Sequence, residues 1–198
     1  MPDDSPNILA FGDSLVAGYG LGRSEGFAPQ LEAALRARGV AATVINAGLS
    51  GNTAGGGSVR LKWVLDRLPE PPDLAIVAFG GNDILRGIPA RETREDMETI
   101  LRILGDRGIG TVLAGMLAPP FLGEGYRREF DAIFPELARD YGACFYPFFL
   151  AGVAGNPKLN QYDRVHPNAA GVARMVKGIL PVVTKALSAS RSTRATTI

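Results

Sequence analysis

The sequence predicts a single α/β domain, in which a parallel sheet of five strands lies between two layers of helices. Two short stretches, Ile8–Phe11 and Leu74–Phe79, are apolar throughout, as strands buried on both faces are. Segments with apolar residues at helical spacing alternate with such stretches along the chain, which is typical of parallel sheets. The chain has 198 residues and 46% hydrophobic content, and it contains no repeat or linker, so one domain is expected over residues 1–187.

The expected elements follow from apolar runs, helical spacing and the glycines and prolines between them. Strands are expected at Ile8–Phe11, Val40–Ala47, Leu74–Phe79, Thr111–Met116 and Cys144–Tyr146. A single helical turn is expected after Ser14, and longer helices within residues 25–39, around 61–68, around 97–104, over 127–141 and over 169–187. Pro135 is expected to kink or break its helix and Pro181 to bend the last one. Residues 188–198, rich in Ser, Thr and Arg, are expected to be a disordered tail.

Composition excludes several classes of function. The 21 basic and 20 acidic side chains give a net charge of +1, so neither nucleic acid nor an anionic membrane surface is an expected partner. No apolar run approaches the roughly 18 residues of a membrane span, so no stable membrane association is expected. Cys144 is the single cysteine and His166 the single histidine. A zinc site with two or three imidazoles is therefore excluded, and no metal or cofactor is expected.

The polar groups that carry chemistry stand where predicted strands end. Ser14 follows the first strand, Gly51 the second and Asn82 the third, while Asp163 and His166 precede the last helix. Because the carboxyl ends of parallel strands meet at one edge of a sheet, these five residues are expected to converge.

This set of residues fits acyl transfer. A serine hydroxyl is a poor nucleophile until a base removes its proton, and His166 is the one imidazole available. Asp163, three residues earlier on the same loop, is placed to orient that imidazole. The backbone N–H groups of Ser14 and Gly51 and the amide of Asn82 would stabilise the oxyanion of a tetrahedral intermediate.

Each motif alone also has a structural interpretation. Gly51 resembles a turn glycine, the Asn82 motif a common strand end, and Asp163 a helix cap. A binding module for FMN or a nucleotide is the alternative of another class. Against it, the glycines that begin at Gly18 do not match Gly-x-Gly-x-x-Gly, and no phosphate-binding Gly-x-x-x-x-Gly-Lys-Ser/Thr motif is present. The joint order of the four motifs favours catalysis.

Four blocks resemble the conserved blocks of the SGNH (GDSL) hydrolases, over about residues 7–187. They are Gly12–Leu15, Asn46–Thr53, Gly80–Asp83 and Asp163–Pro167. The segments Met116–Pro120 and Leu159–Gln161 are similar to the bacterial arylesterase and multifunctional acyl-CoA thioesterase/lysophospholipase branch. The resemblance implies a flavodoxin-like fold with strand order 2-1-3-4-5. Relatives of this branch are often exported, so a periplasmic or secreted protein whose signal has been removed is expected, with a cytoplasmic one as the alternative.

The resemblance also implies roles for single residues. Ser14 would be the nucleophile, Asp163 and His166 the rest of the triad, and Gly51 and Asn82 oxyanion donors together with Ser14. Arg164 departs from the small residue that relatives often carry there, and it is expected to alter the rim of the site. Asp13 and Asp83 match the family blocks, and we interpret both as structural.

The predicted activity is that of a serine esterase on short- to medium-chain acyl or aryl esters, with thioesters as further substrates. Two apolar loops leave the same sheet edge and are expected to line the acyl groove, through Ile84, Leu85, Ile88, Pro119 and Phe121. An acetyl-carbohydrate esterase or lysophospholipase is the alternative within the family. The expected partner is a small-molecule ester, and the expected state is a monomer or small homo-oligomer.

Overall fold

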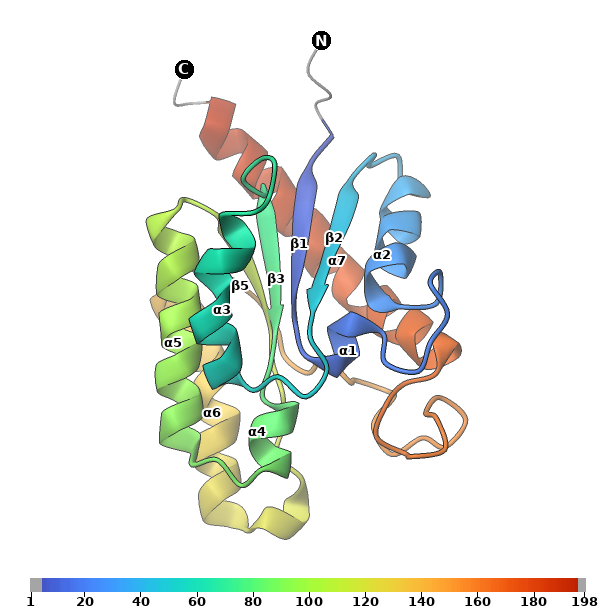
Figure 1. The fold of residues 1–198 in the computed structure, drawn as a ribbon, viewed down its shortest axis with the longest axis vertical. Helices are drawn as coiled ribbons and strands as arrows, with labels where there is room; N and C mark the ends of the chain where they lie inside the picture. Colours follow the sequence, from blue (N-terminus) through green and yellow to red (C-terminus); the bar gives the residue numbers. More distant parts are fainter. Residues whose placement is uncertain (1–4, 196–198) are drawn as a thin grey trace.

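Five parallel strands form one sheet in the order β2-β1-β3-β4-β5 (Figure 1). The computed structural model describes the backbone of residues 5–195 and the side chains of residues 5–190. The strands are β1 (Asn7–Gly12), β2 (Thr43–Gly48), β3 (Leu74–Ala78), β4 (Gly110–Ala114) and β5 (Cys144–Tyr146). The predicted strand number, direction and order are confirmed.

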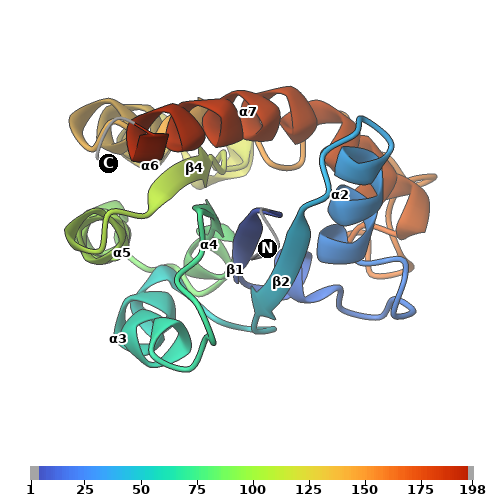
Figure 2. The ribbon, with the colours of Figure 1, turned by 90° about the horizontal axis from the view of Figure 1, so that it is seen from above.

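Helices cover both faces of the sheet, so the predicted three-layer architecture is confirmed (Figure 2). One layer consists of α2 (Phe27–Arg36) and α7 (Ala169–Ala195). The other consists of α3 (Ala54–Leu65), α5 (Ala90–Asp106) and α6 (Glu124–Asp140). The short elements are α1 (Ser14–Ala17), α4 (Gly81–Leu85) and the 3₁₀ helix η1 (Pro120–Leu122). Within the described residues, no helix combines the length and the apolar composition that crossing a membrane requires.

The centre of the core is formed by β1 and β3. Residues 8–12 of β1 and all five residues of β3 are buried, because helices lie over both faces of these strands. The rings of Phe11 and Phe79 meet edge to face, with their centroids 5.2 Å apart. At the sheet edge, only Val44 of β2 is buried, and the other residues of this strand are partly or fully exposed. The two apolar runs that stand out in the sequence are therefore the central strands.

The structure contradicts the expected break of α6 at Pro135. α6 continues without a break through Pro135. Pro135 is exposed, so the missing N–H hydrogen bond lies on the solvent side, while Phe130, Ile133, Phe134 and Leu137 are buried around it. α7 likewise continues through Pro181. In each helix, burial of the apolar face stabilises the helical conformation more than the loss of a single hydrogen bond at proline destabilises it.

The expected disordered tail is wrong for residues 188–195, which continue α7 to Ala195. The hydroxyls of Ser188 and Ser190 donate to the carbonyls of Thr184 and Ala186, both at 3.1 Å. Because both hydroxyls form hydrogen bonds to carbonyls of the preceding helical turn, the polar composition does not end the helix. Residues 196–198, the rest of the expected tail, lie outside the described residues.

Some boundaries also differ from the prediction. α3 begins at Ala54, because the Thr53 hydroxyl caps it by accepting from the Gly56 N–H at 3.2 Å. β2 begins at Thr43, because the chain from Gly39 to Ala42 still forms the turn out of α2, with the Val40 N–H bonded to the Leu35 carbonyl. The short helices α4 and η1 have no signal in the sequence.

Candidate active site

Ser14 lies at the first turn after the central strand β1. It is the first residue of α1, and Asp13 caps this helix by accepting from the Leu15 N–H at 3.0 Å. Gly12 makes the close turn possible, because a Cβ there would lie 2.5 Å from the Ala78 carbonyl oxygen. The Ser14 side chain is thereby fixed at the carboxyl edge of the sheet, where the sequence predicts it.

Asp163 and His166 lie on the loop before α7. One carboxylate oxygen of Asp163 accepts the backbone N–H groups of Val165 and His166 at 2.9 and 3.0 Å. Arg164, which directly follows Asp163, adopts a φ of 58°, in the left-handed region that favours glycine. The backbone of this short turn thus fixes the carboxylate relative to the imidazole.

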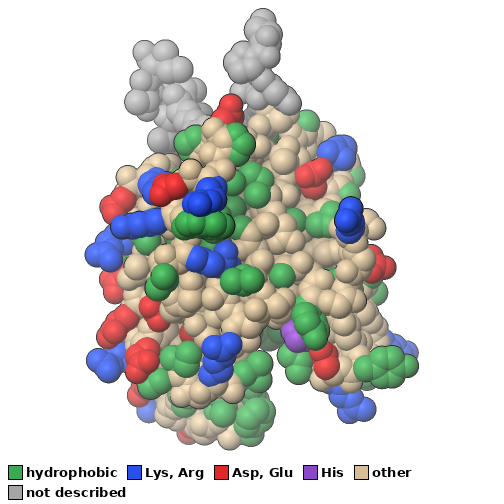
Figure 3. Space-filling view, in the orientation of Figure 1, with side chains coloured by type: hydrophobic (Ala, Val, Ile, Leu, Met, Phe, Trp, Pro, Cys, Tyr) green, Lys and Arg blue, Asp and Glu red, His purple; other side chains and the backbone are tan. Residues whose placement is uncertain are grey.

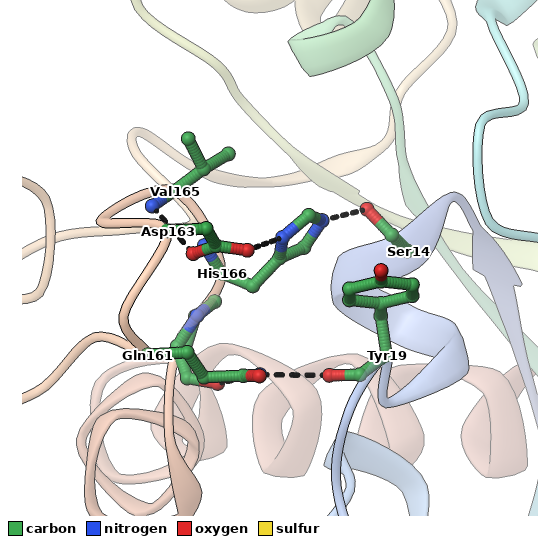
Figure 4. Close-up of polar contacts among 7 residues, drawn as sticks. Ser14, Tyr19, Gln161, Asp163, Val165 and His166 are labelled. Atoms are coloured by element: carbon green, nitrogen blue, oxygen red, sulfur yellow. Dashed lines mark hydrogen bonds and ion pairs between the residues drawn. The ribbon is translucent and has the colours of Figure 1, made fainter.

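The three side chains form one hydrogen-bonded series (Figure 4). His166 Nδ1 lies 2.6 Å from Asp163 Oδ2, and His166 Nε2 lies 3.0 Å from Ser14 Oγ. Since an ionised carboxylate only accepts, Nδ1 carries the hydrogen and Nε2 is left to accept from the serine hydroxyl. The hydrogen bonds from the imidazole and from the two backbone N–H groups lower the pKa of Asp163 to about 2.

Asn82 and Gly51 approach Ser14 from two other strand ends. Asn82 stands on α4, where its Nδ2 donates to the Asn52 carbonyl at 3.0 Å and lies 3.4 Å from Asp13 Oδ2. The second contact is long, so one amide hydrogen remains available to a ligand. Gly51 has a φ of 78°, and its carbonyl accepts from Arg86 at 2.6 Å.

Two arginines that the sequence analysis did not single out hold these loops. Arg60 on α3 donates to the carbonyls of Gly12 and Ala47 at 2.9 and 2.8 Å, and to the Asn52 side chain at 2.6 Å. Arg86 reaches from the end of α4 to Gly51, so it links the two predicted oxyanion segments. Their partners are mainly backbone carbonyls, so no sequence motif marks these contacts.

Two buried carboxyl groups lie under the site. Burial raises the pKa of Asp13 to about 6, against the lowering effect of the Leu15 N–H. Burial also raises the pKa of Asp83, which accepts from the Ala54 N–H at the start of α3 and from the Thr93 hydroxyl. Asp83 therefore connects the segment after β3 to α3 and α5, in agreement with a structural role.

A cavity of about 380 Å³ opens beside Ser14 and His166. In the space-filling view, the single histidine is visible at the surface next to hydrophobic and acidic side chains (Figure 3). Of the residues expected in the acyl groove, Ile84, Leu85 and Pro119 line this cavity. Ile88 and Phe121 do not line it: Ile88 follows the Gly87 turn, and the Phe121 side chain is 83% exposed on η1.

Much of the lining comes from residues that were not predicted to belong to the site. The irregular stretch between β5 and α7 contributes apolar residues, and the loops after β1 and β4 add further ones. Apolar residues in loops are equally typical of ordinary packing, so only the folded chain identifies them. They are Leu15, Tyr19, Met116, Leu117, Phe148, Leu150, Ala154 and Val165.

Comparison with known proteins identifies the family. The model of the GDSL-like lipase/acylhydrolase family matches residues 10–174. The chain belongs to this family. The chain is similar to AlinE4, an esterase of the SGNH-hydrolase family whose crystal structure is known. The two share 52% sequence identity with a TM-score of 0.79, and the match covers 93% of this chain and 97% of the AlinE4 chain.

Two curated relatives are also similar to this SGNH hydrolase. The arylesterase of Vibrio mimicus is 35% identical over 82% of this chain and 80% of its own length. The thioesterase 1/protease 1/lysophospholipase L1 of Escherichia coli K12 is 32% identical over 81% and 75%. The predicted family and the prediction of a carboxylic ester hydrolase are confirmed, and the binding-module alternative is wrong.

Proposed function

We propose that this SGNH hydrolase is a serine esterase in which Ser14 is the nucleophile, His166 the general base and Asp163 the residue that orients it. The observation that carries the proposal is the continuous series from Ser14 Oγ to His166 Nε2 and from Nδ1 to Asp163 Oδ2, at 3.0 and 2.6 Å. With a pKa of about 2, Asp163 is ionised at neutral pH and stabilises the imidazolium that forms during the reaction.

The reaction proceeds in two halves. Ser14 Oγ attacks the ester carbonyl carbon while its proton moves to His166 Nε2, and the carbonyl oxygen becomes an oxyanion. The N–H groups of Ser14 and Gly51 and the Asn82 amide donate to that oxyanion. His166 then gives its proton to the departing alcohol, and Ser14 is left acylated. A water molecule, deprotonated by His166, then attacks the acyl carbon, and His166 returns the proton to Ser14 Oγ as the carboxylic acid leaves.

The proposed substrates are esters with short to medium acyl chains or aryl groups. The cavity of about 380 Å³ is at the small end of the range for ligand sites, and most of its lining residues are apolar. Thioesters are a second proposed class, because the similar Escherichia coli protein carries the name thioesterase 1. Both carbonyl types would use the same nucleophile and oxyanion donors.

One set of assays tests the role of Ser14 and the substrate range together. An organophosphonate is expected to add once per chain, at Ser14, and Ser14→Ala is expected to fold normally with essentially no turnover. Across a panel of p-nitrophenyl esters from two to sixteen carbons, kcat/KM is expected to peak at short or medium chains. Labelling at another residue would overturn the assignment of the nucleophile, and a peak at sixteen carbons would overturn the substrate range.

A further inference from the structure

The hydrogen bonds of the His166 imidazole involve only its two nitrogens, so they do not fix either face of the ring. Its bonds to Asp163 and Ser14 both lie at the ring edge. Such bonds fix the direction of the ring, but they resist only weakly a tilt about the line that joins the two nitrogens. A contact on a face is what limits that tilt.

Tyr19 supplies a contact of this kind (Figure 4). Its ring lies against the His166 ring, with the centroids 4.5 Å apart and the planes inclined at 38°. The Tyr19 side chain is 52% exposed, so it is not held in place by burial in the core. Among the described residues, its hydroxyl makes no hydrogen bond, so the ring itself is the feature that matters.

The backbone directs this ring toward His166. Tyr19 stands between Gly18 and Gly20, whose φ values of 81° and 72° reverse the chain directly after α1. The N–H groups of Gly18 and Tyr19 both donate to the Ser14 carbonyl, at 3.1 and 3.2 Å. Tyr19 is therefore fixed to the same short segment as the nucleophile.

Gln161 connects that segment to the loop of the histidine. Its Nε2 donates to the Tyr19 carbonyl at 2.7 Å and to the Pro167 carbonyl at 2.9 Å, while its backbone N–H donates to the His166 carbonyl at 2.8 Å. The fit at this point is close, because a Cβ on Gly20 would lie 2.3 Å from Gln161 Oε1. One side chain thus holds both partners of the ring contact.

We propose that Tyr19 is a positioning residue for His166, held in place by Gln161. It keeps the imidazole in the plane that serves both Ser14 and Asp163. The negative face of the tyrosine ring also attracts the imidazole more strongly once it has taken up the serine proton. The inference rests on the role of His166 under the proposed function, and the contact acts on kcat because it strengthens in the charged state.

Tyr19 also lines the cavity, so simple substrate binding is the competing explanation. The two explanations differ in the kinetic constant that changes. Loss of a positioning contact lowers kcat and leaves KM nearly unchanged, whereas loss of a binding contact raises KM.

The first experiment compares Tyr19→Ala, Tyr19→Leu and Tyr19→Phe on one p-nitrophenyl ester. Tyr19→Ala and Tyr19→Leu are expected to lower kcat about tenfold with KM within about twofold, and Tyr19→Phe to keep at least about half of kcat. The control is Tyr162→Ala, which removes a fully exposed tyrosine of the histidine loop and should leave both constants unchanged. A rise in KM at constant kcat, or a Tyr19→Phe variant as slow as Tyr19→Ala, overturns the proposal.

The second experiment uses the single histidine. The ring carbon protons of His166 give an unambiguous NMR signal pair, and the neighbouring tyrosine ring displaces it. This displacement is expected to persist in Tyr19→Phe and to disappear in Tyr19→Ala and Tyr19→Leu. Unchanged histidine signals in both of these variants would show that the contact is absent in solution.

The role of Gln161 has its own matched pair. Gln161→Met keeps the shape of the side chain but removes both donors, and it is expected to lower kcat by a factor similar to that of Tyr19→Ala. The control is Gln30→Met, because Gln30 also joins two carbonyls, those of Glu25 and Ala169, at 2.6 and 3.1 Å. If the two variants have equal kcat, Gln161 does not support Tyr19.

Failure of this inference and failure of the proposed function give different results. An active Ser14→Ala variant refutes the proposed nucleophile, whatever Tyr19 does. An inactive Ser14→Ala variant together with a Tyr19→Ala variant of unchanged kcat refutes the positioning role alone.

Discussion

Under the proposed function, Asn82 combines a structural and a catalytic demand. Its amide nitrogen donates one hydrogen bond to the Asn52 carbonyl at 3.0 Å. The distance from the same nitrogen to Asp13 Oδ2 is 3.4 Å, which is long for a second hydrogen bond. A donor that is fixed in this way but not saturated costs little reorganisation when an oxyanion forms. The sequence predicts the donor, and the structure adds the partners that hold it in place.

We expect Asn82→Ala to lower kcat by about 10²–10³-fold with little change in KM, as the loss of one oxyanion donor does in other enzymes. Steady-state kinetics on a p-nitrophenyl ester measures both constants. Asn82→Asp, which keeps the size of the side chain but cannot donate when ionised, should be at least as slow. A change confined to KM would indicate that Asn82 binds only the ground-state ester.

Asp13 makes stability depend on pH. Because the pKa of Asp13 is raised to about 6, the folded state favours the protonated carboxyl group. As the pH rises from about 4 to about 6, the folded state loses up to about 3 kcal/mol of stability through this group. Asp13→Asn removes the charge and keeps the oxygen that accepts from the Leu15 N–H.

The Asp13→Asn variant should therefore be more stable than the original protein at pH 8, by about 1–3 kcal/mol, and similar to it at pH 4. Urea unfolding of both proteins at the two pH values measures the difference. An equal difference in the free energy of unfolding at pH 4 and pH 8 would show that ionisation of Asp13 does not cause it.

Among the helices, α6 shows how tertiary packing overrides local preference. Pro135 stands inside a helix of 17 residues and is exposed, while the opposite face is buried. A proline at such a position costs up to about 3 kcal/mol relative to alanine. The helix forms nevertheless, because burial of the apolar residues on its opposite face outweighs this cost.

Pro135→Ala is expected to raise the free energy of unfolding by about 1–3 kcal/mol, since it restores a hydrogen bond and leaves no cavity on the exposed face. Chemical denaturation of both proteins gives this value. Esterase activity should be unchanged, because no residue of α6 lines the cavity. A less stable alanine variant would mean that the helix depends on the rigidity of Pro135.

Considering the whole molecule, we expect long-range electrostatics to contribute little to the stability of the protein or to the attraction of its substrate. The net charge is +1, and the arginine–carboxylate ion pairs of the described residues are all at least partly exposed. Exposed pairs of this kind stabilise a protein only slightly. A neutral ester carries no net charge for the protein to attract, so screening by salt is expected to have little effect on its binding.

Raising NaCl from about 0.05 to about 0.5 M should therefore change kcat/KM for p-nitrophenyl acetate by less than about twofold. Initial rates at low substrate concentration measure this ratio directly. A steep fall with salt would show that a local charged patch guides the substrate.

The sequence alone predicted the alternation of strands and helices, the family and the convergence of five polar residues. It could do so because these features are local. A short apolar run that ends at a glycine predicts a buried strand, and the carboxyl ends of parallel strands meet at one edge of the sheet. Ser14, Gly51 and Asn82 each follow one of the parallel strands, and Asp163 reaches His166 within one short loop.

The folded structure was needed to establish what surrounds those residues. Gln161 bonds to Tyr19 across 142 positions of sequence, and Phe148, Leu150 and Ala154 line the cavity from a segment without regular structure. It also decided that α6 runs through Pro135 and that Ile88 and Phe121 lie outside the cavity. Contacts of this kind depend on how packed layers fit together, and neither residue type nor spacing along the chain encodes that fit.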